Sequence, residues 1–379
     1  MKEPRAGLQI NHDIPALTGL RGVAAVMVFI AHAIPVTELS ARSPGSAISR
    51  ILEAGWMGVP LFFALSGYLI TWLALKEKDD YGSFDLGRFC IRRCLRIWPL
   101  YYTVVALAIL AGNFSSIGWL APEASWVPAL LLFAVNLVIT HRGSGSGLGV
   151  LLPFWTLAAE EQFYLIWGLA LKTFTQRNLA IFAGVLLFIS IVFHWLPLPY
   201  GNIVLYRVEP AITASSIMFG CLLALSRDWV APFEKRMRLI TALWLVMLAA
   251  VIFFTPQANF PTWALSLETL AVDITSVLAV WLASTSGTII SRILSAKPLI
   301  FLGNISYCLY AVHVPVIGSF GRGLNFGEAM GRMSPVGAVL YYLLAPLITA
   351  CLISWLWTRA EEPIRKLRKQ WRRTGKAKS

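Results

Sequence analysis

The sequence predicts an all-α protein that crosses a membrane many times. The chain has 379 residues, of which 57% are hydrophobic and only 13% are charged. Soluble domains carry about 25% charged residues, so this composition does not fit one. The mean hydropathy is +0.68, and apolar segments long enough for membrane helices recur along the whole chain. Together these observations predict a polytopic integral membrane protein.

Eleven apolar segments are candidate membrane helices. A helix needs about 20 residues to cross the hydrocarbon core, and most of the segments approach that length. The segment 127–140 is the weakest candidate, because it is shorter and contains Pro128 and Asn136. In chain order the candidates are 16–36, 54–75, 96–112, 127–140, 151–171, 178–197, 210–226, 239–255, 263–284, 299–318 and 336–357.

Positive charge between the segments predicts the topology. Lys and Arg gather in the loops 76–97, 227–238 and 286–298 and in the C-terminal tail, and such residues mark the cytoplasmic side. If 127–140 crossed the membrane, the first of these loops would lie opposite the others. We therefore predict about ten transmembrane helices plus one re-entrant or interfacial segment, with both termini cytoplasmic. This placement accounts for the net charge of +13, so nucleic-acid binding is not expected.

The chain divides into three expected regions. A cytoplasmic N-terminal segment covers 1–15, a transmembrane domain covers 16–357, and a basic cytoplasmic tail covers 358–379. The N-terminus lacks a small-residue cleavage site, so the first apolar segment is predicted to be a retained span. No Walker motif, GxGxxG or metal-ligand spacing occurs, and no metal is expected.

The first apolar segment carries two ionisable side chains, Arg21 and His32, eleven residues apart. Eleven helical steps end about 20° from a whole number of turns, so both lie on one face, about 16 Å apart along the axis. Ionisable groups inside a span are rare unless they line an interior site. A neutral imidazole can accept a proton from an alcohol near pH 7, which makes His32 a candidate general base. The alternative is a histidine hydrogen-bonded to a helix neighbour, without a chemical role.

Two adjacent carboxylates, Glu160 and Glu161, lie inside the apolar segment 151–171. Neighbouring side chains on a helix point about 100° apart, so at most one of the two faces a given histidine. A carboxylate beside an imidazole orients the ring and stabilises its protonated form. The alternative is a structural ion pair with an arginine such as Arg207.

Three arginines, Arg92, Arg93 and Arg96, precede the third apolar segment. Arg92 and Arg96 are four residues apart, and Arg93 and Arg96 three, so each pair shares a helix face. Guanidinium groups suit phosphates because they donate two parallel hydrogen bonds. A simple positively charged flank of a membrane helix would explain the cluster as well.

Near the C-terminal end of the chain, Ser306, Tyr310 and His313 follow helical spacing and form a polar stripe. The stripe could line the same cavity as His32, or it could be polar packing between helices. Three other histidines are not part of a polar motif in the sequence and are assigned no role: His12, His141 and His194.

These motifs, taken in order, resemble the membrane acyltransferase-three family, whose members acylate sugars and other secreted acceptors in bacteria. Arg21 and His32 match its R-x10-H pair. The other matching stretches are GVPLFFALSGYL, RRCLRIWPLYY, WTLAAEEQFYL, SYCLYAVHVP and EEPIR, which extend the resemblance over nearly the whole chain. One departure occurs in YRVEPAITASSIMFG, where Thr213 and Ser215 replace an Arg and an Asp that the family often has.

The resemblance implies a membrane O-acyltransferase. Its donor would be acetyl-CoA or another acyl-CoA, held from the cytoplasmic side. Arg92, Arg93 and Arg96 would hold the CoA phosphates, with Arg21 near the donor. The acceptor would be a hydroxyl of a cell-surface polysaccharide or lipopolysaccharide sugar at the outer face of a bacterial inner membrane.

The same resemblance implies roles for further residues. His32 would deprotonate the acceptor or carry the acyl group, Glu160 or Glu161 would tune it, and His313 is the remaining catalytic candidate. Arg207 and Glu209 would bind the acceptor in place of the missing Arg and Asp. A thioester carbonyl that becomes tetrahedral needs oxyanion donors, and the candidates are Ser66, Ser306 and Tyr307.

Two alternatives stay open. One is acylation of a small secreted product, such as a macrolide or a Nod-type oligosaccharide. The other is a proton-coupled glycan transporter, because many spans with an intramembrane histidine would also fit transport. Transporters often contain inverted repeats, and the sequence shows no internal repeat. The expected partners are the bilayer, acyl-CoA and a hydroxyl acceptor, and a homo-oligomer is compatible with the sequence.

Overall fold

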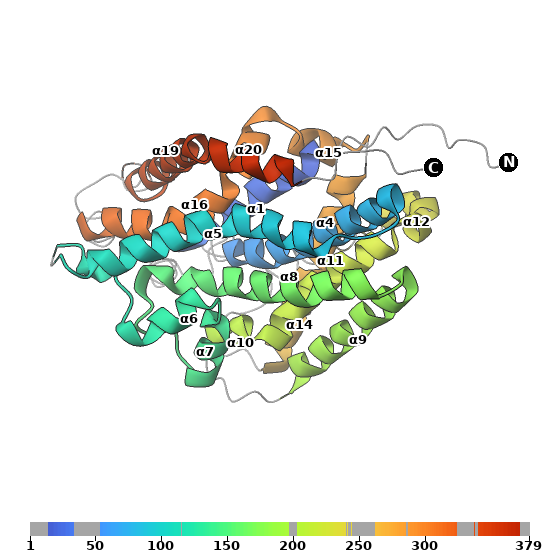
Figure 1. Ribbon diagram of the computed structural model, residues 1–379, viewed down its shortest axis with the longest axis horizontal. Helices are drawn as coiled ribbons and strands as arrows, with labels where there is room; N and C mark the ends of the chain where they lie inside the picture. Colours follow the sequence, from blue (N-terminus) through green and yellow to red (C-terminus); the bar gives the residue numbers. More distant parts are fainter. Residues whose placement is uncertain are drawn as a thin grey trace.

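The protein is a bundle of helices in a computed structural model (Figure 1). The structure describes residues 14–33, 54–114, 116–196, 203–239, 241, 244, 262–285, 287–323, 337 and 340–371. Every regular element among these residues is helical. The helices are α1 (Pro15–Ala33), α4 (Gly58–Tyr81), α5 (Leu86–Ala111), α6 (Val127–Leu131), α7 (Val135–Arg142), α8 (Trp155–Thr173), α9 (Gln176–Trp195), α10 (Ile203–Val208), α11 (Pro210–Leu225), α12 (Arg227–Val230), α14 (Thr262–Ser284), α15 (Ile289–Leu294), α16 (Lys297–Gly323), α19 (Ala345–Ala360) and α20 (Glu362–Gln370).

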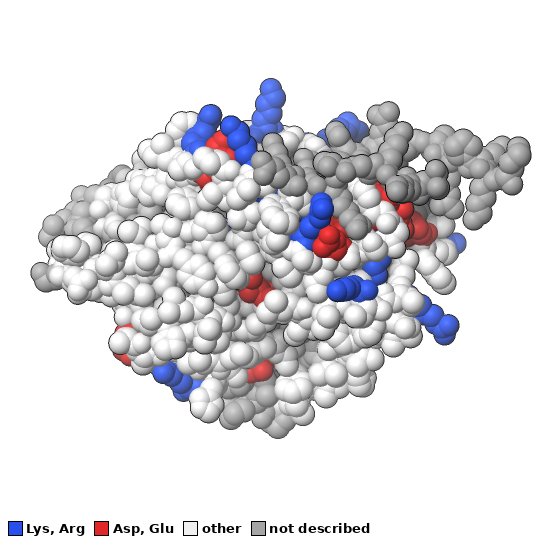
Figure 2. Space-filling view, in the orientation of Figure 1, with Lys and Arg blue, Asp and Glu red and all other residues white. Residues whose placement is uncertain are grey.

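Seven of the described helices are long and apolar enough to cross a membrane. They lie in α1, α4, α5, α9, α14, α16 and α19, the last extended by the π-helix Leu340–Leu344. Helix α8, which contains two adjacent carboxylates, and the 16-residue α11 pack among them. Figure 2 shows mostly uncharged residues on the visible face, with most visible Lys and Arg in its upper and right-hand parts. The fold is therefore that of a multi-pass membrane protein. Of the candidate segments, most of 239–255 lies outside the described residues.

The basic segment 76–97, expected to be a loop, is helical over most of its length. Helix α4 continues to Tyr81 and α5 begins at Leu86, which leaves only four residues between them. Lys, Arg and Glu are good helix formers, so charge alone does not end a helix. The side chain of Asp85 accepts a hydrogen bond from the amide of Arg88 and caps α5, while Gly82 ends α4 with a positive φ of 72°.

Close helix crossings at glycines form the centre of the bundle. Helix α1 packs along α16, and α4 packs along α11. A Cβ atom at Gly303 would lie 1.8 Å from the carbonyl oxygen of Thr18, and one at Gly220 would lie 2.1 Å from that of Ala64. Only glycine allows backbones to approach so closely in a membrane bundle. The first crossing joins the two helices that carry His32 and His313.

The weakest candidate segment, 127–140, does not form one straight helix. It contains α6 and α7. The segment Gly118–Leu131, which ends with α6, makes an angle of 117° with α7. Phe133 lies at the bend with a φ of 52°. The buried Asn136 and the half-buried Gln162 exchange two amide hydrogen bonds of 3.0 and 2.9 Å, and Gln162 also donates to the carbonyl of Phe133. This amide pair fastens the bend to α8.

Replacing Asn136 with Leu is expected to lower the thermal unfolding midpoint of the purified protein in detergent. The substitution leaves the Oε1 atom of Gln162 without its donor, and an unsatisfied buried polar group costs about 1–3 kcal/mol. The exposed Asn178 provides the control variant Asn178→Leu, which should leave the midpoint unchanged. Equal midpoints for wild type and Asn136→Leu would contradict the role of this pair.

Candidate active site

Three neighbouring cavities run through the bundle, and their linings overlap. The basic cavity, of about 490 Å³, is lined by Arg21, Lys76, Arg92, Arg93, Arg96 and Arg368 among others. The middle cavity, of about 110 Å³, shares Arg21, Arg93 and Arg96 with it. The histidine cavity, of about 340 Å³, contains His32 and shares Val59, Phe63 and Tyr310 with the middle cavity.

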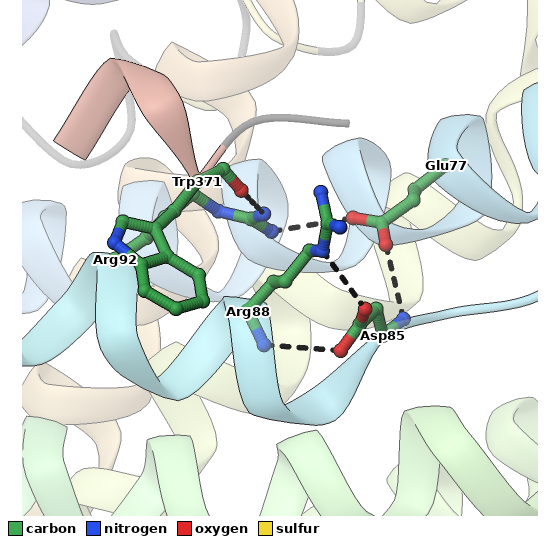
Figure 3. Close-up of polar contacts among 5 residues, drawn as sticks. All are labelled: Glu77, Asp85, Arg88, Arg92 and Trp371. Atoms are coloured by element: carbon green, nitrogen blue, oxygen red, sulfur yellow. Dashed lines mark hydrogen bonds and ion pairs between the residues drawn. The ribbon is translucent and has the colours of Figure 1, made fainter. Parts of the chain in front are cut away.

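The basic cavity carries an excess of positive charge. Six basic side chains line it against two carboxylates, Glu77 and Asp80. Figure 3 shows Arg92 between Glu77, at 3.2 Å, and the backbone oxygen of Trp371, at 3.1 Å. Arg92 thus joins α4 and α5 to the end of the C-terminal helix. Arg21, Arg93 and Arg96 add further positive charge to the cavity and would attract an anionic ligand.

Arg21, Arg93 and Arg96 lie where the basic and middle cavities meet. Glu160 is the single carboxylate in the lining of the middle cavity. The Arg93 guanidinium lies over the rings of Phe89 and Tyr164, at 5.5 and 5.2 Å from their centroids. Cation–π contacts offset part of the cost of burying this charge. Three guanidiniums against one carboxylate leave room for a further negative group at this junction.

Glu160 is held firmly in the middle cavity. Its two carboxylate oxygens accept hydrogen bonds from Ser66 at 2.6 Å and from Tyr164 at 2.9 Å. Nearby, the hydroxyls of Thr156 and Tyr310 share a hydrogen bond of 2.7 Å. The structure does not bring Glu160 to His32, because the two line different cavities.

Glu161 points away from this row of cavities, as expected for the neighbour of Glu160. One of its oxygens accepts a 3.4 Å hydrogen bond from the indole of Trp98 on α5. The other is buried without a hydrogen-bond partner within the described residues. Neither carboxylate pairs with Arg207, whose partner is Glu268 at 3.5 Å.

His32 and His313 are brought together by the crossing of α1 and α16. Their rings are 4.9 Å apart and nearly perpendicular, at 76°. In each ring Nδ1 bonds a backbone carbonyl, that of Val28 or Tyr310. A carbonyl oxygen only accepts, so both Nδ1 atoms carry the proton and both Nε2 atoms keep a lone pair. His32 is exposed on the wall of its cavity, so its Nε2 atom is available as a base.

The expected oxyanion donors already donate elsewhere. Ser66 donates to Glu160, Ser306 to the carbonyl of Gly303, and Tyr307 to the carbonyl of Ile97. All three line the middle cavity. Since a hydroxyl has one proton, none of these three side chains has a proton left for a developing oxyanion in its present position.

The histidine cavity holds one of the two residues expected to bind an acceptor, Arg207. Arg207 lines it, with its guanidinium 3.5 Å from the centroid of Trp56 and its Nε atom buried without a partner among the described residues. Glu209 is the N-cap residue of α11 and does not line the cavity. The structure therefore separates these two predicted residues.

Sequence reasoning missed a second polar cluster, which includes His194. This side chain is buried and bonds Tyr206 at 2.7 Å and Ser215 at 3.3 Å. Ser215 in turn contacts Asp273. Asp273 was missed because, like Glu268, it lies inside the apolar segment 263–284 without a motif around it. The described residues contain no group of three or more potential metal ligands.

The last matched motif, EEPIR, joins the C-terminal helix to the bundle. Glu361 accepts a 3.1 Å hydrogen bond from the indole of Trp357. Burial raises the pKa of this carboxyl above its ordinary value, while Arg368 and Arg365 oppose the shift. Arg365 pairs with Glu362. The motif thus places α20 beside α5, where Arg368 joins the basic cavity.

Comparison with known proteins identifies the class. A model of the acyltransferase domain family matches residues 14–358, and the chain belongs to this family. It is 27% identical to the peptidoglycan O-acetyltransferase OatA of Listeria monocytogenes over 80% of this chain and 49% of that protein. It is 24% identical to the O-acetyltransferase OatA of Staphylococcus aureus over 93% of this chain and 57% of that protein.

The chain therefore spans about half the length of the curated relatives it matches. No solved structure matches it.

Proposed function

We propose that this protein moves an acetyl group from acetyl-CoA, bound in the basic cavity, to a hydroxyl of a cell-surface glycan in the histidine cavity. The observation that carries the proposal is the overlap of the three linings. Arg21, Arg93 and Arg96 join the basic cavity to the middle one, and Tyr310 joins the middle one to the cavity of His32. A donor and an acceptor can thus approach one reaction centre from opposite ends.

The charge of the basic cavity supports an acyl-CoA donor. The phosphates of CoA are multiply charged, and guanidiniums bind phosphate through short, charge-assisted hydrogen bonds. Arg93, Arg96 and Arg368 lie on the predicted cytoplasmic side, where acyl-CoA is made. Arg21 lies at the junction, where the thioester would enter the middle cavity.

The size of the middle cavity supports a short acyl group. Its volume is about 110 Å³, smaller than an engineered cavity of about 150 Å³ that binds benzene. An acetyl group fits such a space and a sugar ring does not. This favours acetyl transfer over the alternative of glycan transport.

The chemistry follows from the available base. The Nε2 atom of His32 takes the proton from the acceptor hydroxyl, and the alkoxide oxygen attacks the thioester carbonyl carbon. A carbon–oxygen bond forms, the carbon–sulfur bond breaks, and CoA leaves as the thiolate. Arg21 and Arg96, which line the basic and middle cavities, hold the negatively charged donor in place. Glu160, held by Ser66 and Tyr164, balances their charge.

The acceptor and topology complete the proposal. Related proteins bear the names of peptidoglycan and other O-acetyltransferases, which favours a glycan over a lipopolysaccharide-specific or small secreted acceptor. We place ten spans in a bacterial inner membrane, with both termini cytoplasmic and 127–140 re-entrant or interfacial. The regions 1–15 and 358–379 would flank the transmembrane domain.

The test is thiol release from acetyl-CoA by the full chain in lipid nanodiscs, with chitotetraose as acceptor. We expect acetylated tetrasaccharide by mass spectrometry. The variant Arg96→Ala should raise the KM for acetyl-CoA about tenfold or more, because hydrogen bonds to charged groups contribute about 1.5–3 kcal/mol. The exposed Arg177 gives the control Arg177→Ala, with an unchanged KM.

Two results would count against this assignment. A wild-type chain that leaves the thioester intact would overturn acetyl transfer itself. An unchanged KM in Arg96→Ala would overturn the placement of the donor in the basic cavity.

A further inference from the structure

A buried carboxylate lines the same cavity as His32. Asp273 lies within the apolar helix α14, is 1% exposed, and contributes to the cavity lining. Its two carboxylate oxygens accept hydrogen bonds from Ser215 and Ser216 of α11. An isolated carboxylate inside a membrane helix is expensive, and such groups mark functional sites more often than packing.

A network of hydrogen bonds surrounds Asp273. His194 bonds Tyr206 at 2.7 Å through Nδ1 and Ser215 at 3.3 Å through Nε2. Tyr206 donates to Ser266, which in turn donates to the carbonyl of His194. Ser215 and Ser216 both donate to the carboxylate, so the network holds Asp273 in place as a hydrogen-bond acceptor.

The carboxylate keeps capacity for a ligand. Two carboxylate oxygens offer about four lone-pair positions, and the serines use two of them. The hydroxyls of Thr213 and Thr269, on the same wall, already donate to the helix carbonyls of Pro210 and Leu265. They can therefore only accept from a ligand. The wall thus presents several acceptors and requires a ligand that brings O–H or N–H donors.

We propose that Asp273, with Thr213 and Thr269, forms the subsite that binds hydroxyl groups of the acceptor and orients it toward His32. This inference rests on the proposed acetyl transfer. Sugar hydroxyls supply the donors that the wall requires, and the buried Nε atom of Arg207 can donate to a sugar oxygen. Trp56 and Trp155 supply apolar surface for the C–H face of a sugar ring.

The experiment compares two Michaelis constants in the full chain in nanodiscs, with acetyl-CoA and chitotetraose as the probes. Asp273→Asn keeps the shape of the side chain and removes its charge. We expect the KM for chitotetraose to rise about tenfold or more, with an unchanged KM for acetyl-CoA and an unchanged thermal midpoint. Asp228 is exposed on α12, and Asp228→Asn is the control with both constants unchanged.

A second variant keeps the test decisive if Asp273→Asn does not fold. Thr269→Val preserves volume and removes the hydroxyl from the wall, so it should raise the KM for chitotetraose while sparing that for acetyl-CoA. If the wild type transfers acetyl but the variants change both Michaelis constants equally, or change neither, Asp273 has only a structural role. Absence of transfer by the wild type would overturn the proposed function and this subsite with it.

Discussion

Replacing His32 with Ala is expected to lower the rate of acetyl transfer by about 10²- to 10⁴-fold, the usual contribution of a positioned general base. The ring contacts His313 and bonds only the carbonyl of Val28 on its own helix. Its removal should therefore leave insertion and folding intact. The measurement is acetyl ester formation on chitotetraose at saturating acetyl-CoA, with monodisperse protein confirmed by size-exclusion chromatography.

A histidine at a different place provides the matched control. His141 is exposed on α7 and outside the three cavities, so His141→Ala should transfer acetyl at the wild-type rate. His313→Ala should fall between the two, since His313 contacts His32 without lining the cavity. Wild-type transfer by His32→Ala would exclude this imidazole as the base.

Replacing Gly303 with Ala is expected to be among the most disruptive single-methyl changes in the described part of the chain. The added Cβ would lie 1.8 Å from the carbonyl oxygen of Thr18, which is backbone and cannot rotate away. Overpacking costs typically about 1–3 kcal/mol, and here α1 and α16 must separate. We expect a lower thermal midpoint and loss of transfer, because this crossing sets the contact of His32 with His313.

Gly184 supplies the comparison for this prediction. It lies within α9, and a Cβ there would meet nothing within 4 Å. Gly184→Ala should raise stability slightly, since Ala favours a helix over Gly by about 1 kcal/mol. Equal midpoints and activities for the two variants would show that the α1–α16 crossing tolerates a side chain.

Much of the helical fold could be predicted because a membrane helix is a local property of the sequence. Apolar length placed α1, α4, α9 and α16 within a few residues of their described positions. The prediction of a loop at 76–97 was wrong, because charged residues such as Arg and Glu are good helix formers and can continue a helix. The bend of 127–140 was signalled by Pro128 and Asn136, but its geometry depends on Gln162, 26 residues away.

The site was harder to predict, because its contacts join distant parts of the chain. Helical spacing could place Arg21 and His32 on one face, and it could separate Glu160 from Glu161. It could not show that Ser66 binds Glu160, 94 residues later, or that Ser215 meets Asp273 across 58 residues. The two acids Glu268 and Asp273 inside an apolar segment were the available signal for the second cluster.

The small volume of the middle cavity bears on the membrane potential. A membrane protein with cavities reached from both sides would dissipate this potential if ions could pass through it. Between its wider neighbours, the space of about 110 Å³ is bordered by Phe62, Phe63 and Leu65 and carries fixed charge at Arg21 and Glu160. Apolar walls and fixed charge both oppose the passage of hydrated ions. The bundle can thus be accessible from two sides while the membrane keeps its electrical potential.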